Sequence, residues 1–283
     1  MSARYPGRRA AARLICLIVA LCPAAALADQ LQQVISRGSL RCGVYADVPP
    51  FAAPDPVSRQ MVGMDVDLCA ALAGQLQLKL ELVPLSVESR IPELQMGRVD
   101  ILVANLAYSR RRAAQILFSD AYYVAREILV VHAADAGLPL SAFRGQRLSA
   151  TKGSTSAQSI LVNHARAVTY QDTGAAYLAM QQHKVRGFVT NGMTARKLVQ
   201  QVAADGVALG MVAEPMALEP IGVGLRKGER ALAARINQAL HRLDAEGRID
   251  AIWTHWLGPD TVYRMSRQER VTPIDQLDFE PLP

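Results

Sequence analysis

The polar residues that could contact a ligand stand at the ends of apolar runs in this sequence. Asn105 follows the apolar run 101–104, and Asn191 follows the expected strand 187–190. Buried parallel strands have continuous apolar runs of this kind, and ligands of open α/β sheets bind beyond the carboxyl ends of the strands. Both asparagines are therefore candidate ligand contacts, one in each half of the chain.

A second polar group lies where a helix is expected to begin. Gly153-Ser154-Thr155 follows the expected strand 147–151. A glycine followed by hydroxyl residues at a helix start exposes backbone N–H groups that can bind a carboxylate oxygen. Ordinary capping of the helix by Ser154 explains the same residues equally well. The residues alone leave both interpretations open.

The sequence has no pattern typical of a metal site, a redox site or a nucleophilic triad. The histidines are scattered without metal-ligand spacing: His132, His164, His183, His241 and His255. We therefore expect no metal and no cofactor. A buried carboxylic acid in a cleft could still transfer protons, and the acids to consider are Glu88, Glu127 and Glu214. None of these acids lies in a catalytic motif, so we expect the protein not to be an enzyme.

The first 28 residues have the features of a cleavable signal peptide. Ala26-Leu27-Ala28 has small residues at the two positions that a signal peptidase reads, and the apolar run 14–21 follows four arginines: Arg4, Arg8, Arg9 and Arg13. Cleavage before Cys22 as a lipoprotein is the alternative, but Leu21 stands where a small residue is usual. No later stretch has the roughly 20 apolar residues of a membrane helix. We expect a soluble periplasmic protein.

The charge of the mature chain excludes nucleic acid as a partner. The whole sequence has a net charge of +6, and the leader holds four arginines and no acid, so 6 − 4 leaves +2. No clustered basic surface of the kind that binds nucleic acids is expected from that balance.

Only Cys42 and Cys69 remain after cleavage. They fall in the expected first strand and in the helix packed on it. The sequence allows either a disulfide between them or two buried free thiols.

Strands and helices are expected to alternate along the chain, which predicts an α/β fold. The first half reads as strand 40–45, helix 65–76 capped by Asp65, strand 79–83, a short helix after Ser89 and strand 99–104. The second half reads as strand 147–151, a helix from 153, helix 174–183 and strand 187–190. Parallel sheets covered by helices follow from this order.

Two crossovers between the halves are expected, at 127–131 and 217–225. Two amphipathic helices follow, and their apolar faces carry Leu232, Ile236, Leu240 and Leu243, then Ile249, Ile252, Trp253 and Trp256. We interpret Trp253 and Trp256 as packing residues of the first lobe. The predicted domains are a signal peptide at 1–28, a discontinuous lobe 1 at 29–130 and 219–283, and a lobe 2 at 131–218.

Several motifs, in this order, resemble the polar amino-acid solute-binding proteins of ABC importers (bacterial extracellular solute-binding proteins, family 3). They are Pro49-Pro50-Phe51, Gly63-Met64-Asp65-Val66-Asp67-Leu68, Arg90-Ile91-Pro92-Glu93-Leu94, Gly97-Arg98-Val99-Asp100, the segment 105–112, and Phe118-Ser119-Asp120-Ala121-Tyr122. The resemblance runs from about Leu40 to Gly258. It implies a type II periplasmic binding protein, in which two Rossmann-like lobes joined by a two-strand hinge close on a ligand.

The resemblance also implies a set of contacts for a small carboxylate-bearing ligand. Arg112 matches the arginine that clamps the ligand carboxylate, and a guanidinium suits that task because it donates two parallel hydrogen bonds. Without the resemblance, the triplet 110–112 would be read as a surface charge run. The same register makes Thr155 a contact beside Ser154. Asp65 and Asp67 are expected to cap a helix and face solvent.

Three positions depart from the family pattern. Ala107 stands where many members have a serine or threonine, and Asn191 stands where an ammonium-binding aspartate is common. Tyr45 replaces another acid of some relatives, and with Phe51 and Val87 it is expected to form an apolar wall. A cleft without these acids predicts that lysine, arginine and histidine are poor ligands.

The predicted function is that of the periplasmic substrate-binding component of an ABC importer. Its partners would be a small amino-acid-like molecule and the permease in the inner membrane, and we expect a monomer. Two alternatives stay open, namely a periplasmic enzyme of the same fold, of the dehydratase or lytic transglycosylase type, and a periplasmic partner protein outside transport.

Overall fold

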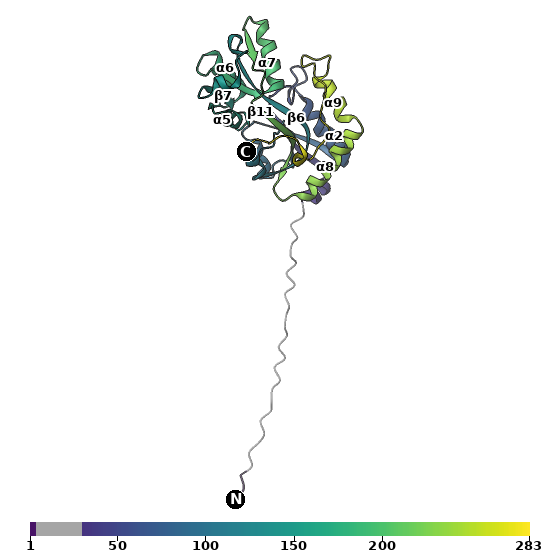
Figure 1. Cartoon of the computed structure of the whole chain (residues 1–283). Helices are drawn as coiled ribbons and strands as arrows, with labels where there is room; N and C mark the ends of the chain where they lie inside the picture. The colour runs from purple at the N-terminus through teal and green to yellow at the C-terminus, as the bar shows by residue number, and fades with distance from the viewer. Residues whose placement is uncertain (4–29) are drawn as a thin grey trace.

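The computed structural model describes residues 1–3 and 30–283, which form two lobes connected by long strands (Figure 1). The predicted signal peptide, 1–28, lies almost entirely outside the described residues. Among the helices of the described part, none combines the length and the apolar character needed to cross a membrane. The fold is α/β, as the alternating pattern predicted.

Lobe 1 is built on the parallel strands β4, β1 and β5, in that spatial order. Its elements before the hinge are α1 (Gln30–Arg37), β1 (Ser39–Tyr45), β2 (Ala53–Pro54), β3 (Met61–Val62), α2 (Met64–Leu76), β4 (Lys79–Leu85), α3 (Arg90–Gln95), β5 (Ile101–Leu102) and α4 (Arg110–Ala113). After the hinge, α8 (Arg230–Ala245) and α9 (Arg248–Leu257) return to lobe 1 and pack on α2. The strand predicted at 99–104 is shorter in the structure, because β5 contains only Ile101 and Leu102.

Lobe 2 repeats the parallel arrangement with strands β9, β7 and β8. Its elements are β7 (Arg147–Thr151), α5 (Ser156–Val162), β8 (Arg166–Tyr170), α6 (Thr173–Gln181), β9 (Gly187–Asn191), α7 (Gly192–Ala204) and β10 (Leu209–Met211), with short 3-10 turns at Ala133–Asp135 and Leu140–Phe143. Strand β8 and helix α7 were not predicted. Neither has a continuous apolar run, because both are only partly buried.

Two antiparallel strands, β6 (Ile116–His132) and β11 (Ala217–Arg226), join the lobes (Figure 1). β11 also pairs with β5 of lobe 1, whereas the second half of β6 pairs with β9 and β10 of lobe 2. The crossovers expected at 127–131 and 217–225 fall within these strands. β6 begins earlier than predicted because its first half is a strand of lobe 1.

Separate groups of buried side chains stabilise the two lobes. The largest gathers residues from both sides of the hinge, including Leu72 of α2, Leu240 of α8 and Trp253 of α9. Trp253 packs edge-on against Tyr123 at 5.5 Å between ring centroids, which confirms that it is a packing residue. Two further groups belong to lobe 2 and centre on Phe143 and Phe188.

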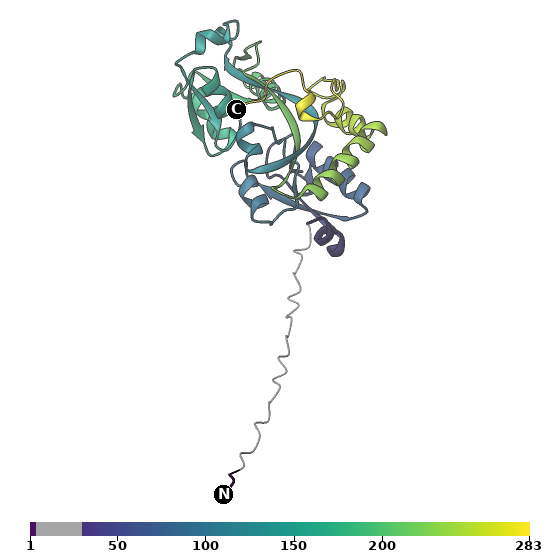
Figure 2. The same ribbon diagram turned by 60° about the horizontal axis from the view of Figure 1, so that its bottom comes forward.

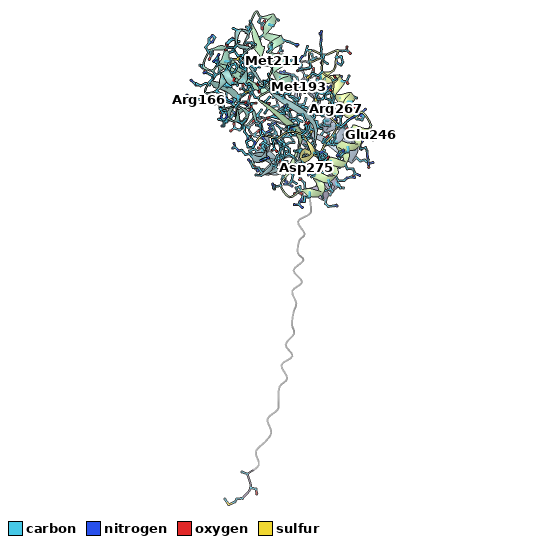
Figure 3. All side chains as sticks on the ribbon, in the orientation of Figure 1. Arg166, Met193, Met211, Glu246, Arg267 and Asp275 are labelled. Carbon is cyan, nitrogen blue, oxygen red and sulfur yellow. A yellow bond between two sulfur atoms is a disulfide. The ribbon has the colours of Figure 1, made fainter. Side chains whose placement is uncertain are left out.

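The segment after α9 returns across the hinge (Figure 2). Thr272 exchanges backbone hydrogen bonds with Ala121 of β6, and the buried guanidinium of Arg267 is paired with Asp244 and Asp250. Arg267 and Asp275 mark the course of this segment in Figure 3. The chain ends beside lobe 2, where the side chain of Gln158 in α5 donates to the carbonyl of Pro283.

The structure joins Cys42 of β1 to Cys69 of α2 by a disulfide, which resolves the two possibilities left by the sequence.

The prediction that Asp65 caps α2 is wrong. The residue before the helix is Gly63, and Asp65 is fully buried within the first turn. Asp67, expected at the surface, accepts a hydrogen bond from the indole Nε1 of Trp256 at 2.7 Å.

Candidate functional site

A small polar cavity lies between the lobes, at the place where the paired strands β6 and β11 pass from one lobe to the other. Its volume is about 40 Å³, and both lobes and both hinge strands contribute to its wall. The wall is formed by Tyr45, Val48, Val87, Arg90, Asn105, Glu127, Thr151, Ser154, Thr155, Ser156, Thr173, Thr190, Asn191, Thr194 and Glu219. Five of the eight predicted ligand contacts are among these residues, namely Tyr45, Asn105, Ser154, Thr155 and Asn191.

Arg112 lies beside this cavity and connects the lobes. Its Nη1 donates to the carbonyl of Ala107 at 2.8 Å, and its Nη2 donates across the cleft to the carbonyl of Gly153 at 2.9 Å. The side chain is 6 % exposed, whereas Arg110 and Arg111 are exposed, as expected for solvated neighbours. Burial, and then the nearby charge of Arg90, lower the pKa of Arg112 to about 10. The guanidinium therefore remains charged at neutral pH.

Arg90 is a second buried cation and, unlike Arg112, lies in the cavity wall. Its Nη1 donates to the hydroxyl of Tyr45 at 2.8 Å and to the carbonyl of Ala104, and its guanidinium lies 5.0 Å from the centre of the Tyr45 ring. The Nε atom of Arg90 has no hydrogen-bond partner. Tyr45 is thus a polar contact of the cavity as well as part of its wall, and burial raises the pKa of its hydroxyl.

Asn105 is held at the end of β5 by two buried side chains. Its backbone N–H donates to Asp65 at 2.8 Å, and its side-chain oxygen accepts from the Tyr123 hydroxyl. Its φ of 41° is in the left-handed region, which asparagine tolerates better than most residues. Burial raises the pKa of Asp65 to about 7, although hydrogen bonding to Asn105 and the charge of Arg90 oppose this shift. Asp65 therefore positions Asn105.

The segment 153–156 brings lobe 2 against lobe 1. Gly153 has φ 78°, and a Cβ atom there would lie 2.9 Å from the Cα of Glu88 in lobe 1. The hydroxyl of Ser154 donates to the carbonyl of Thr151 at 2.6 Å, so the capping of α5 by Ser154, one of the two interpretations left open by the sequence, is not present. Thr155 and Ser156 are buried and their hydroxyls face the hinge carboxyls.

Asn191 caps the helix that follows it. Its Oδ1 accepts from the N–H of Met193 at 2.9 Å, which uses the acceptor that we had expected to meet a ligand. Its Nδ2 is buried and has no partner, so the side chain offers the cavity a donor. Asn191 is also the cross-strand neighbour of Glu127.

Two carboxyl groups reach the cavity from the hinge strands, Glu127 from β6 and Glu219 from β11. They are 3 % and 2 % exposed, and both line the cavity wall. Burial raises the pKa of both groups, and repulsion by Glu219 raises the pKa of Glu127 further, well above its usual range. The premise that the cleft lacks acids is therefore wrong, because it considered only the strand ends at 45 and 191.

Three predicted contacts do not lie in the cavity wall, namely Arg112, which lies beside it, Phe51 and Ala107. Phe51 is fully buried behind Tyr45, with 6.3 Å between their ring centroids, so it supports the wall without forming it. Ala107 is buried and bridges Ile221 of β11 through its backbone, and its carbonyl orients Arg112. Sequence reasoning also missed Arg90 and Glu219. The signal for Glu219 was an acid inside an apolar strand of the hinge.

A second cavity, of about 350 Å³, lies against β6 where α7 meets the C-terminal segment. Its wall is mainly apolar and includes Met193, Met211 and Trp253. In Figure 3 the label of Met193 lies between those of Met211 and Arg267. The cavity is larger than the one between the lobes, but the buried charged side chains gather at the smaller one, which we therefore take as the candidate site.

Comparison with known proteins places this arrangement in a family. The sequence profile of bacterial extracellular solute-binding proteins, family 3, matches residues 40–259. The chain belongs to this family. A curated relative, the ABC transporter glutamine-binding protein GlnH of Bacillus subtilis, is 26 % identical over 238 residues, which cover 82 % of this chain and 86 % of the relative.

Solved structures of similar proteins have the same fold. An ancestral arginine-binding protein bound to arginine is 31 % identical, with a TM-score of 0.71 over 78 % of this chain and 99 % of that protein. The ancestral amino acid-binding protein AncCDT-1, a precursor of cyclohexadienyl dehydratase, is 27 % identical, with a TM-score of 0.70 over 82 % of this chain and all of that protein. The two-lobed type II architecture predicted from the motifs is thereby confirmed.

Proposed function

We propose that this family 3 protein is the substrate-binding component of an ABC importer and captures an amino-acid-like solute by closing its two lobes. The observation that carries the proposal is the buried polar cavity between the lobes, whose wall includes side chains of both lobes. Such a site is complete only when the lobes are together. Closure and ligand capture are then one event.

The cations of lobe 1 supply recognition of a carboxylate. Arg112 has two donor groups in contact with backbone carbonyls, and the buried Nε of Arg90 has no partner. A desolvated carboxylate that meets such donors gains charge-assisted hydrogen bonds, which are stronger than those between neutral groups. We propose that Arg112 and Arg90 hold the carboxylate, with Asn105, Ser154 and Thr155 as neutral contacts.

The remaining parts of the functional assignment follow from the family. A substrate-binding component delivers its ligand to a permease in the inner membrane, which we propose as the protein partner. The proposed location is the periplasm, reached by cleavage of the signal peptide, and the proposed state is a monomer that binds no nucleic acid. The amino acids that GlnH and the ancestral arginine-binding protein bind define the ligand class to test first.

A thermal-shift screen of the mature protein tests the proposal. The panel contains the twenty amino acids, small carboxylates without an amine, and amines without a carboxylate. A ligand at a hundredfold its Kd stabilises the folded state by about 2.7 kcal/mol, which raises the melting temperature measurably. A specific hit within the amino acids or carboxylates supports the proposal, and a flat response across the panel contradicts it.

One observation favours a second function, that of a periplasmic enzyme. Of the acids considered from sequence, Glu127 lies in the cavity with a strongly raised pKa, whereas Glu214 is exposed and Glu88 forms a surface ion pair with Lys152. A buried acid that holds its proton is a possible general acid. Recovery of each screening hit unchanged after long incubation, measured by mass spectrometry, supports binding alone, and its conversion supports the enzyme.

A further inference from the structure

The hinge strands carry the two most deeply buried acids of the cleft, and no cation neutralises them directly. No ion pair of Glu127 or Glu219 with an arginine or lysine exists within the described residues. Arg112 and Arg90, both from lobe 1, act on the pair only over a longer range. Buried carboxyls are costly unless they are paired or protonated, so a pair kept at this place needs an explanation.

Both acids have an oxygen that no hydrogen bond satisfies. These atoms are Oε2 of Glu127 and Oε1 of Glu219. Unsatisfied donors occur in the same wall, at Nε of Arg90 and Nδ2 of Asn191. Unpaired buried polar atoms are rare in folded proteins. Here they are arranged as acceptors on the hinge strands and donors on the lobes, a distribution that fits a ligand with one donor end and one acceptor end.

We propose that Glu127 and Glu219 together bind the ammonium group of the ligand. This inference rests on the proposed function, because it assigns the cationic end of the same amino-acid-like solute. An ammonium group has three N–H donors and no acceptor, so two carboxyl oxygens and a neighbouring hydroxyl satisfy it fully. Thr155 and Ser156 supply such hydroxyls at the pair.

The protonation of the pair agrees with this assignment. Burial and repulsion by Glu219 raise the pKa of Glu127 well above its usual range, so the pair retains a proton more readily than two separate carboxyls do. A ligand ammonium can replace that proton and bring the same charge to the same place. The proposed ligands are thereby narrowed to α-amino acids, and carboxylates without an amine are excluded.

A purely structural role is the competing explanation. The acids could act as a latch that accepts hydrogen bonds from Thr155 and Ser156 when the lobes close. A latch would strengthen the binding of every ligand to the same extent, whereas an ammonium site distinguishes ligands by their amine. The experiment therefore compares each amino acid with its own deaminated analogue.

The test uses isothermal titration of the wild-type mature protein with the best amino acid from the twenty and with the carboxylic acid that lacks only its α-amine. We expect the amino acid to bind at least about thirtyfold more tightly, the usual lower range for loss of a buried charged partner. The double variant Glu127→Gln/Glu219→Gln should remove most of that difference. Glu214→Gln, which changes an exposed acid of lobe 2, should leave it unchanged.

Each contrary result has a definite meaning. Equal affinity of wild type for both ligands overturns the inference while the proposed function stands, and this comparison needs no variant that might fail to fold. Equal weakening of both ligands in the double variant also overturns it, in favour of the latch. If no amino acid and no carboxylate binds, the proposed function fails, and the inference fails with it.

Discussion

At the scale of single residues, the cleft combines groups that are fixed by the protein with groups left open for a ligand. Asp65 holds Asn105, and Tyr45 holds Arg90, so these side chains are oriented before any ligand arrives. Arg112 is different because its two hydrogen bonds end on different lobes. It therefore contributes both to recognition and to closure.

Substitution Arg112→Ala should weaken binding of the ligand found by screening by about 2–5 kcal/mol, because its carboxylate would be desolvated without a charged partner. Isothermal titration measures the change. Arg111→Ala is the matched control, since Arg111 is exposed in the same helix α4. Wild-type affinity in Arg112→Ala would show that the carboxylate lies elsewhere.

Asp65 should make the stability of the protein depend on pH. Its pKa is raised to about 7 in the folded state, so it stays protonated there while the unfolded chain ionises near pH 4. Its contribution is complete below about pH 4 and is lost as the pH rises to about 7. Relative to Asp65→Asn, the free energy of unfolding of wild type should fall by up to about 4 kcal/mol over this range.

Urea denaturation at several pH values measures that difference. Asp67→Asn is the control, because Asp67 is only partly buried and pairs with Trp256, so its curve should keep the wild-type slope. Parallel curves for wild type and Asp65→Asn would mean that folding leaves the pKa of Asp65 unchanged, which contradicts the prediction.

At the scale of elements, what could be predicted depended on how strongly each segment is buried. Strand β9 and helix α9 followed from apolar runs and helical spacing, since burial makes them apolar. Strand β8 was missed because it lies at an edge of the sheet with a mixed sequence. Asn105 and Asn191 were found because each is a polar residue directly after a segment that the sequence predicts to be a buried strand. The acids of β6 and β11 were missed as ligand groups because their meeting depends on how two distant strands pair.

The link between β1 and α2 gives a prediction at this scale. The disulfide of Cys42 with Cys69 closes a loop with a sequence separation of 27 residues, for which the loss of chain entropy in the unfolded state corresponds to about 3.5 kcal/mol. Reduction with dithiothreitol should lower the free energy of unfolding by about that amount. Cys42 and Cys69 lie outside the cavity wall, so affinity should be unchanged.

Alkylation without reductant, followed by mass spectrometry, provides the control for this experiment. Protein expressed in the periplasm should carry no alkylated cysteine. Two alkylated thiols in the native protein would contradict the disulfide directly.

At the scale of the whole molecule, few contacts hold the lobes together apart from the hinge. Arg112 donates to Gly153, and Glu88 of lobe 1 pairs with Lys152 of lobe 2 at 2.7 Å. The ion pair is largely exposed, and such pairs contribute at most about 1 kcal/mol. The closed arrangement should therefore be in balance with an open one when the cleft is empty.

Small-angle scattering should show a smaller radius of gyration when the screened ligand is added at saturation. The reason is that the ligand is bound by both lobes and stabilises only the closed form. Glu88→Ala removes the exposed ion pair with Lys152 and the exposed hydrogen bond from Gln171, so it should enlarge the empty protein slightly and weaken binding by less than about fivefold. An unchanged radius in wild type with verified ligand would contradict hinge closure.

The course of the C-terminal segment has a practical consequence for handling the protein. Pro283 accepts a hydrogen bond from Gln158 and, with Arg112 and Ser154, lines a cavity at the outer rim of the cleft. A fluorophore attached after Pro283 would therefore be near both lobes and should change its emission when they move. A bulky purification tag at the same point would obstruct that movement, so the opposite terminus of the mature chain is the safer place for a tag.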